Sequence, residues 1–178
     1  MTSDSAVGIS GYVRVGDRRY REVIGLAYEE FTVGDVFEHR PGRTVTEMDN
    51  VLMSSLSLNT SPLHIDAAYC EHTPWGRPLV SSLVTLSIVS GMSVRSTSGR
   101  AVANLGWDSI RLPHPVFAGD TLYAESEILA KRLSASRPGH GIVRVRTVGT
   151  KADGETVLTF ERSFLMPSRE HAMDDRRY

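Results

Sequence analysis

The sequence predicts an α+β domain in which an antiparallel sheet wraps around one long central helix. Three observations lead to this fold class. A strand-like segment precedes two or three helical segments, the longest helical segment is rich in small residues, and the chain from Ala101 onward alternates apolar and polar residues. Runs of helix followed by runs of strand are typical of α+β domains with an antiparallel sheet.

The composition is that of an ordinary globular domain. A chain of 178 residues, 40% apolar and 23% charged, is long enough for one domain with a substantial core. The formal net charge of −1 gives no electrostatic reason to expect nucleic acid or an anionic membrane as a partner. The single cysteine, Cys70, excludes an intrachain disulfide, and no segment resembles a signal peptide or a membrane span. We therefore expect a cytoplasmic protein.

The chain divides into three parts. Residues 1–27 show no clear periodicity and form an N-terminal extension, residues 28–167 form the domain, and residues 168–178 form a charged tail. The domain opens with a predicted strand over residues 36–45, which Pro41-Gly42 interrupts.

Capping residues locate the first helices. Thr46, with Asp49 three residues later, predicts the start of a helix that ends near Leu58. Asp66 predicts the cap of a short helix over residues 67–71.

Residues 79–95 form the predicted central helix. Large apolar side chains there are interspersed with serines and one glycine. Small residues let other backbone approach on several sides, which suits a helix that the sheet surrounds.

Alternation and turn residues locate the remaining strands. They are predicted at residues 101–105, 107–112, 121–133, 141–151 and 157–166. A sheet with unpaired edges and one covering helix leaves surface open, so we expect a homodimer or a higher homo-oligomer.

Several motifs occur in a fixed order along the chain. The first is Asn59-Thr-Ser-Pro-Leu-His64-Ile-Asp, in which the Asn and the His are five residues apart. It is followed by Trp75-Gly-Arg-Pro-Leu-Val, the helix to Gly91, Asn104-Leu-Gly-Trp and Pro115-Val-Phe-Ala-Gly-Asp. This series resembles the MaoC-like dehydratases, the family of the R-specific enoyl-CoA hydratases. The resemblance, over residues 31–167, implies a single hotdog domain, dimerisation through the sheets and a thioester site near the dimer interface.

The resemblance also implies roles for individual residues. In the family, an Asp and a His hold the water that is added across, or removed from, the double bond of an enoyl thioester. His64 matches that His, and Asn59 stands where the better-known members carry the Asp. Ser90 matches a serine that, in some members, hydrogen-bonds near the catalytic pair, and Gly106 lies where the family offers a backbone N–H to the thioester oxygen. The Asn-x4-His version is similar to a sub-branch that acts on branched or dicarboxylic acyl-CoAs, of the mesaconyl and itaconyl kind.

The chemistry of hydration fits these residue types. The reaction needs a base for water, an acid for the α-carbon and donors for the enolate oxygen. An imidazole can take and return a proton near neutral pH, so His64 is the candidate general base and acid. An Asn carboxamide is not a base but can orient a water, which is the role we expect for Asn59.

Other candidate residues have a structural interpretation as well. Asp66 and Glu47 are candidate acids, but they also suit a helix cap and a first-turn charge. Arg77, like Asp66 a candidate substrate-binding residue, is suited to a CoA phosphate or a substrate carboxylate, yet it also reads as a surface residue beside a glycine turn. The hydroxyl of Ser90 can bond the carbonyl one turn back, and Gly106 can mark a strand bulge.

We expect no metal and no cofactor apart from the CoA or carrier protein that forms part of a thioester substrate. No pair of histidines has metal-ligand spacing with a carboxylate or cysteine partner, and no glycine-rich phosphate loop follows a strand. Two other functions stay open. One is a hotdog acyl-CoA thioesterase, and the other is a catalytically inactive hotdog that serves as a binding partner, an alternative that Asn59 in place of Asp allows.

Overall fold

The computed structural model describes residues 11–173, and its main feature is a five-stranded antiparallel sheet. The strand order is β3-β5-β6-β7-β4. The strands are β3 (Val36–Thr44), β4 (Ala103–Arg111), β5 (Thr121–Leu133), β6 (His140–Lys151) and β7 (Thr156–Pro167). All neighbouring pairs are antiparallel, which confirms the predicted α+β class.

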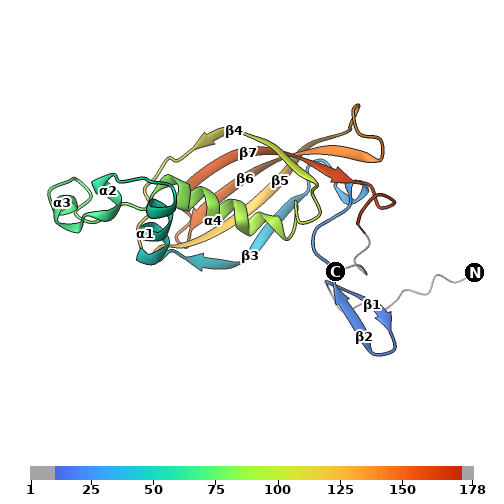
Figure 1. Cartoon of the computed structure of the whole chain (residues 1–178), viewed down its shortest axis with the longest axis horizontal. Helices are drawn as coiled ribbons and strands as arrows, with labels where there is room; N and C mark the ends of the chain where they lie inside the picture. The colour runs from blue at the N-terminus through green and yellow to red at the C-terminus, as the bar shows by residue number, and fades with distance from the viewer. Residues whose placement is uncertain (1–10, 174–178) are drawn as a thin grey trace, which may run out of the picture.

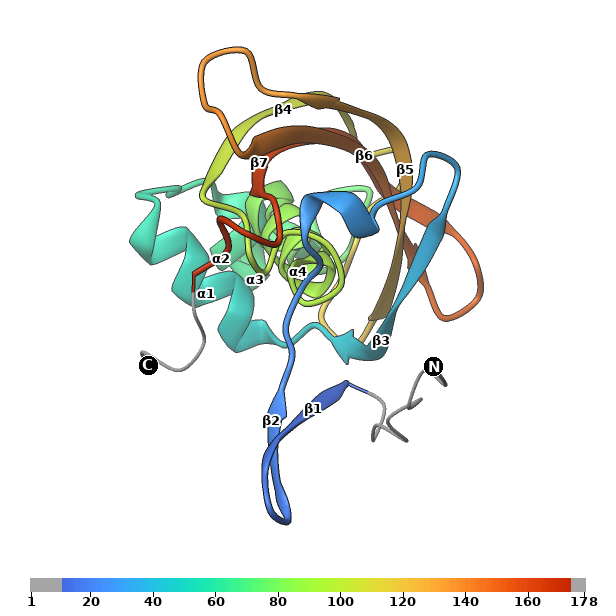
Figure 2. The ribbon, with the colours of Figure 1, turned by 90° about the vertical axis from the view of Figure 1, so that its right-hand side faces the viewer.

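The sheet curves around helix α4 (Ser82–Val94), which lies against its concave face (Figures 1 and 2). Val89 of the helix is fully buried in a cluster with Leu122 and Phe160 of the sheet. The two layers approach closely at Gly149, where an added Cβ would lie 2.7 Å from a methyl carbon of Val89. The prediction of a central, wrapped helix is thereby confirmed.

Helix α4 begins later than the sequence indicated. Leu79 and Val80 were predicted as its first residues, but they continue as extended chain. The N–H of Leu79 donates to the carbonyl of Leu63 at 2.9 Å, and that of Val80 donates to Val116 at 2.9 Å. These two long-range bonds replace the first helical turn.

Helix α1 (Glu47–Leu56) lies alongside the N-terminal part of α4, and helices α2 (Pro62–Ile65) and α3 (Ala67–Glu71) lie beyond that end of α4 (Figure 1). Both predicted caps are confirmed, because the Thr46 hydroxyl accepts the N–H of Asp49 and the Asp66 carboxylate accepts that of Tyr69. Helix α2 is a single turn between the two helices that the caps predicted, and it begins with a proline, which is favoured at the first helical position.

Two strand predictions differ from the structure in an informative way. Strand β4 joins the segments predicted separately at 101–105 and 107–112. Its register against β7 shifts between Asn104 and Gly106, and such a bulge breaks the alternation on which the prediction relied. The interruption predicted in β3 at Pro41-Gly42 is confirmed by a register shift between His39 and Arg43.

A hairpin in the N-terminal region was missed. Strands β1 (Tyr12–Gly16) and β2 (Arg19–Glu22) pair with each other and extend away from the sheet (Figures 1 and 2). Nearly all their residues are exposed, so no buried face imposes an alternating pattern. Among residues 11–173, no helix is long and apolar enough to cross a membrane.

A buried polar cluster joins the sheet to the C-terminal end of α4. The guanidinium of Arg162, which is only 4% exposed, donates to the hydroxyls of Ser93 and Ser98 at 3.0 Å each. The carbonyl end of a helix favours a cation, which helps to stabilise this charge. His39 lies in the same region and bonds to the hydroxyl of Ser126 through Nε2 at 2.8 Å. Burial, aided by the charges of Arg162 and Arg40, lowers the pKa of His39 to about 4.

Candidate functional site

His64 lies on α2, where one hydrogen bond of its ring selects the tautomer of the neutral form. Nδ1 is 2.8 Å from the backbone carbonyl oxygen of Leu79. Because a carbonyl oxygen can only accept, Nδ1 carries the ring proton in this contact. Nε2 of the neutral ring therefore keeps a free lone pair, which is the form that a general base requires.

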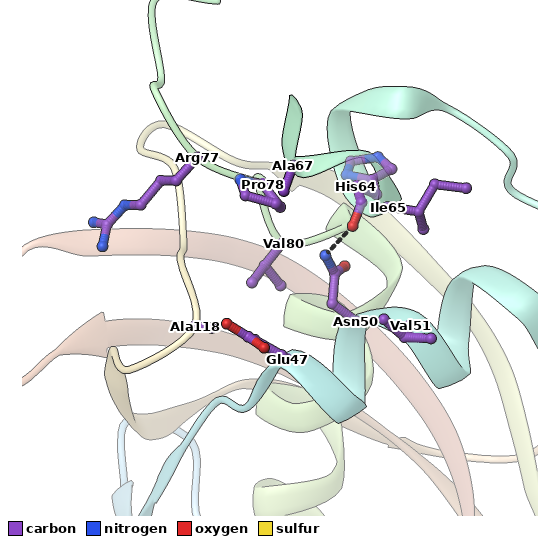
Figure 3. A pocket seen from close by; sticks show the side chains of 10 residues that line it. All are labelled: Glu47, Asn50, Val51, His64, Ile65, Ala67, Arg77, Pro78, Val80 and Ala118. Atoms are coloured by element: carbon purple, nitrogen blue, oxygen red, sulfur yellow. Dashed lines mark hydrogen bonds between the residues drawn. The ribbon is translucent and has the colours of Figure 1, made fainter. Parts of the chain in front are cut away.

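Asn50 of α1 is hydrogen-bonded to the backbone of His64, and our sequence analysis did not single it out. Its side chain is only 4% exposed. Nδ2 donates to the backbone carbonyl of His64 at 2.8 Å (Figure 3) and to that of Leu79 at 3.2 Å. Oδ1 accepts the N–H of Ser81 at 2.8 Å. The sequence did offer one indication, which is that asparagine is unfavourable inside a helix unless its amide finds hydrogen-bond partners.

His64 lines two cavities. One, of about 330 Å³, is shared with Arg77, and we call it the Arg77 cavity. Its lining residues are Glu47, Asn50, Val51, His64, Ile65, Ala67, Arg77, Pro78, Val80 and Ala118 (Figure 3). The other, of about 270 Å³, is shared with His114 and is called the His114 cavity. It also contains Trp75 and the first residues of α4.

The N-terminus of α4 opens on the His114 cavity. Ser82 and Thr85 line that cavity, and no side chain caps the helix. The first N–H groups of a helix have no partner within the helix and carry its positive dipole end. The hydroxyl of Ser81, a residue that is 1% exposed, also has no hydrogen-bond partner among the described residues. The first N–H groups of α4 are therefore candidate donors for a developing oxyanion beside His64, whereas the Ser81 hydroxyl is enclosed and Ser81 lines neither cavity.

Asn59 and Asp66 have observed structural bonds. Oδ1 of Asn59 accepts the N–H of Ser61 at 3.3 Å, and Oδ1 of Asp66 accepts the N–H of Tyr69 at 2.9 Å. Neither residue lines the two cavities. The Asn-x4-His spacing therefore places Asn59 at the turn that leads into α2, and Asp66 caps α3.

Ser90 and Gly106 lie away from His64. Ser90 is in the second half of α4, where its hydroxyl accepts from Nη1 of Arg162 at 3.4 Å. Gly106 lies at the register shift of β4, as the strand-bulge interpretation has it. Neither residue lines a cavity that His64 lines.

Arg77 and Glu47 do share the Arg77 cavity with His64. The guanidinium of Arg77 lies 4.0 Å from the ring centre of Phe117, a cation–π contact that holds an otherwise exposed cation. Figure 3 shows its side chain extending away from His64. Within the part of the chain that the structure describes, no three His, Cys, Asp or Glu side chains are grouped to hold a metal ion.

Comparison with known proteins identifies the family. The model of the family described as mesaconyl-CoA hydratase matches residues 8–177, nearly the whole chain. The chain belongs to the mesaconyl-CoA hydratase family.

Individual relatives and solved structures agree with this assignment. The β-methylmalyl-CoA dehydratase of Chloroflexus aurantiacus is 32% identical over 157 residues, which is 80% of this chain and 44% of that protein. A solved MaoC domain protein dehydratase from Chloroflexus aurantiacus is 30% identical with a TM-score of 0.77, over 85% of this chain and 45% of that one. A protein from Mycobacterium tuberculosis described as having a double hotdog fold is 25% identical with a TM-score of 0.74, over 84% and 46%.

These comparisons confirm the MaoC-like family and the hotdog fold. They also show a difference in length, because the chain spans less than half of the curated relatives that it matches first, such as 44% of the β-methylmalyl-CoA dehydratase. One hotdog unit in this chain corresponds to a part of each longer relative.

Proposed function

We propose that this protein is a hydro-lyase that reversibly adds water to the double bond of an enoyl-CoA thioester. The observation that carries the proposal is the ring of His64. Its Nδ1–H is bound to the Leu79 carbonyl, its Nε2 is free to accept a proton, and it lines two cavities. The names of the relatives support a CoA thioester as the substrate.

The proposed reaction uses His64 first as a base and then as an acid. Nε2 takes a proton from water while the water oxygen forms a bond to the β-carbon. The electron pair of the double bond moves through the α-carbon to the thioester oxygen, which gives an enolate. The imidazolium then returns the proton to the α-carbon, so that the elements of water are added and His64 regains its neutral form. No cofactor takes part in these steps.

The enolate oxygen needs donors close to His64. We assign this role to the first N–H groups of α4, at the end of the helix where Ser82 lines the His114 cavity. The helix dipole would favour the negative oxygen at that end. This assignment replaces Gly106, which lies on β4 outside both cavities. Asn59 keeps its proposed role in orienting the water, through the Nδ2 donor that its turn bond does not use.

The proposed acyl group is branched or dicarboxylic, of the mesaconyl kind. This follows from the family to which the chain belongs and from the names of its relatives. Arg77, in the cavity that it shares with His64, is the proposed partner for an anionic group of the substrate, either a carboxylate or a CoA phosphate. We expect the cytoplasm as the compartment, as the composition indicated.

A second copy of the chain is proposed to complete the site. Strand β4 lies at one edge of the sheet and carries large apolar residues that are about half exposed, among them Leu105 at 51% and Trp107 at 44%. An exposed apolar edge strand favours pairing with another strand. The longer relatives support a second hotdog unit, which a homodimer would supply. Light scattering should give twice the mass of the chain, and a monomeric mass at assay concentrations would contradict this arrangement.

The decisive experiment replaces His64 by asparagine. The amide of H64N can still donate to the Leu79 carbonyl, but it cannot act as a base. Hydration of mesaconyl-, itaconyl- or crotonyl-CoA should be followed by loss of the enoyl-thioester absorbance. The wild type should hydrate at least one of them, and H64N should be slower by roughly 100-fold or more. H72N, a change of an exposed histidine on the neighbouring segment, is the matched control and should keep wild-type activity.

The alternatives predict other outcomes. Full turnover by H64N would contradict the proposed mechanism. Release of free CoA thiol without hydration would favour the thioesterase, whose water attacks the thioester carbonyl. If neither activity occurs with CoA or carrier-protein thioesters, the binding partner is the better interpretation.

A further inference from the structure

The side chain of Asn50 joins three segments that are distant in the sequence. It connects α1 to the backbone of His64, to the extended segment at Leu79 and to Ser81 at the start of α4. The three bonds use the two N–H donors and the carbonyl acceptor of one amide. In a side chain that is 4% exposed, such a complete set of bonds fixes the amide in one orientation.

Two of these bonds hold the backbone of His64 and the Leu79 carbonyl that accepts the proton of its ring. The Leu79 carbonyl accepts Nδ1–H of His64 at 2.8 Å and Nδ2–H of Asn50 at 3.2 Å, so it lies between the two side chains. The other N–H of Asn50 holds the backbone carbonyl of His64 itself. The amide therefore holds the backbone that carries the ring and the acceptor that receives the ring's proton.

We propose that Asn50 is a positioning residue that keeps His64 in the Nδ1–H tautomer, with Nε2 unprotonated and ready to accept a proton from water. This inference rests on the proposed function for its catalytic meaning, but the tautomer of the ring is a property of the free protein. The third bond, from the N–H of Ser81, ties the start of α4, with its proposed oxyanion donors, to the same amide. One buried amide thus holds both halves of the site.

The substitution Asn50→Asp tests the donors alone. Aspartate has the same shape and can still accept the N–H of Ser81, but its second oxygen would face the carbonyls of His64 and Leu79 without a proton to donate. The ring would lose its fixed acceptor, and both tautomers would become populated. Asn50→Ala, which removes all three bonds, is the second variant. Ser54→Ala is the matched control, because Ser54 lies one turn later on α1, is 3% exposed and has no partner for its hydroxyl among the described residues.

The first measurement is the ¹⁵N NMR spectrum of the histidine rings, with His64 assigned through H64N. The wild type should show His64 protonated at Nδ1, N50D and N50A should show a mixture of tautomers, and S54A should match the wild type. The second measurement is turnover of the enoyl-CoA that the wild type hydrates. Both Asn50 variants should lower kcat roughly ten- to hundredfold, because the reacting geometry changes. N50A, which adds no charge to the Arg77 cavity that Asn50 lines, should leave KM within about twofold.

Several outcomes would overturn the inference. Protonation of wild-type His64 at Nε2 would do so whether or not the variants fold. An unchanged Nδ1–H tautomer in a folded N50D or N50A would assign Asn50 a purely structural role, as would wild-type kcat. If the wild type hydrates no enoyl-CoA while His64 responds to N50D as expected, the proposed function fails and the positioning of the ring stands.

Discussion

Protonation of His39 should make the fold sensitive to acid, and replacing this histidine by glutamine should remove the effect. The side chain is 2% exposed and bonds to Ser126 through Nε2. Burial is the main cause of its lowered pKa, and the guanidinium groups of Arg162 and Arg40 act in the same direction. A glutamine amide can keep a bond to the hydroxyl of Ser126 but does not titrate in this range.

The magnitude follows from the two pKa values. The pKa is about 4 in the folded state and 6.5 in the reference state, so the unfolded chain binds the proton more readily between these values. The contribution of His39 to the free energy of unfolding is therefore fully present above pH 6.5 and is lost as the pH decreases toward 4. At about 1.4 kcal/mol per pKa unit, the loss is about 2 kcal/mol at pH 5 and about 3 kcal/mol below pH 4.

Urea unfolding followed by far-UV circular dichroism at pH 8 and pH 5 measures this difference. The quantity to compare is the change between the two pH values, because H39Q also alters stability at pH 8. Carboxylates that titrate, such as Glu30 and Asp49, contribute equally to both proteins and cancel. H72Q is the control, since His72 is exposed and its replacement should leave the pH dependence intact.

The reasoning would be refuted if H39Q lost as much stability as the wild type between pH 8 and pH 5. It would also be refuted if the wild type showed no loss in that interval. In either case the buried cluster around Arg162 would tolerate a second positive charge, and the neutral state of His39 would not contribute to the fold.

Two further changes test the packing and the capping that support the site. Gly149→Ala would place a Cβ 2.7 Å from a methyl carbon of the buried Val89 and force α4 away from the sheet, so the free energy of unfolding measured in urea should fall by about 1–3 kcal/mol. The control is Gly16→Ala on the β1–β2 hairpin, where the nearest atom lies at 3.7 Å, and equal effects of both changes would contradict the close approach. Thr46→Ala removes the hydroxyl that accepts the N–H of Asp49 and should destabilise the protein by about 1 kcal/mol. Thr32→Ala, at an exposed threonine that caps no helix, is the control and should leave the urea midpoint unchanged. An unchanged midpoint for Thr46→Ala would mean that water replaces the cap.

The sequence alone was sufficient for those features that depend on neighbouring residues. The caps of α1 and α3 follow from side chains three residues apart, and the strands β5, β6 and β7 from alternation over twelve or thirteen residues. The order of the motifs indicated the family and pointed to His64. The β1–β2 hairpin could not be predicted in this way, because a strand with no buried face has no alternating pattern.

The tertiary structure decided how His64 is held. Its partners are 15 residues away at Leu79 and 14 residues away at Asn50, and a second bond joins Asn50 to Leu79 across 29 residues. Contacts of this kind depend on the path of the chain between α1 and α4, which local pattern does not specify. For the same reason the structure separates Ser90 and Gly106 from the cavities of His64 although they lie in the matched motifs. The sequence determined which residue types can carry the chemistry, and the path of the backbone determined which of them meet, because hydrogen bonds act only over about 3 Å.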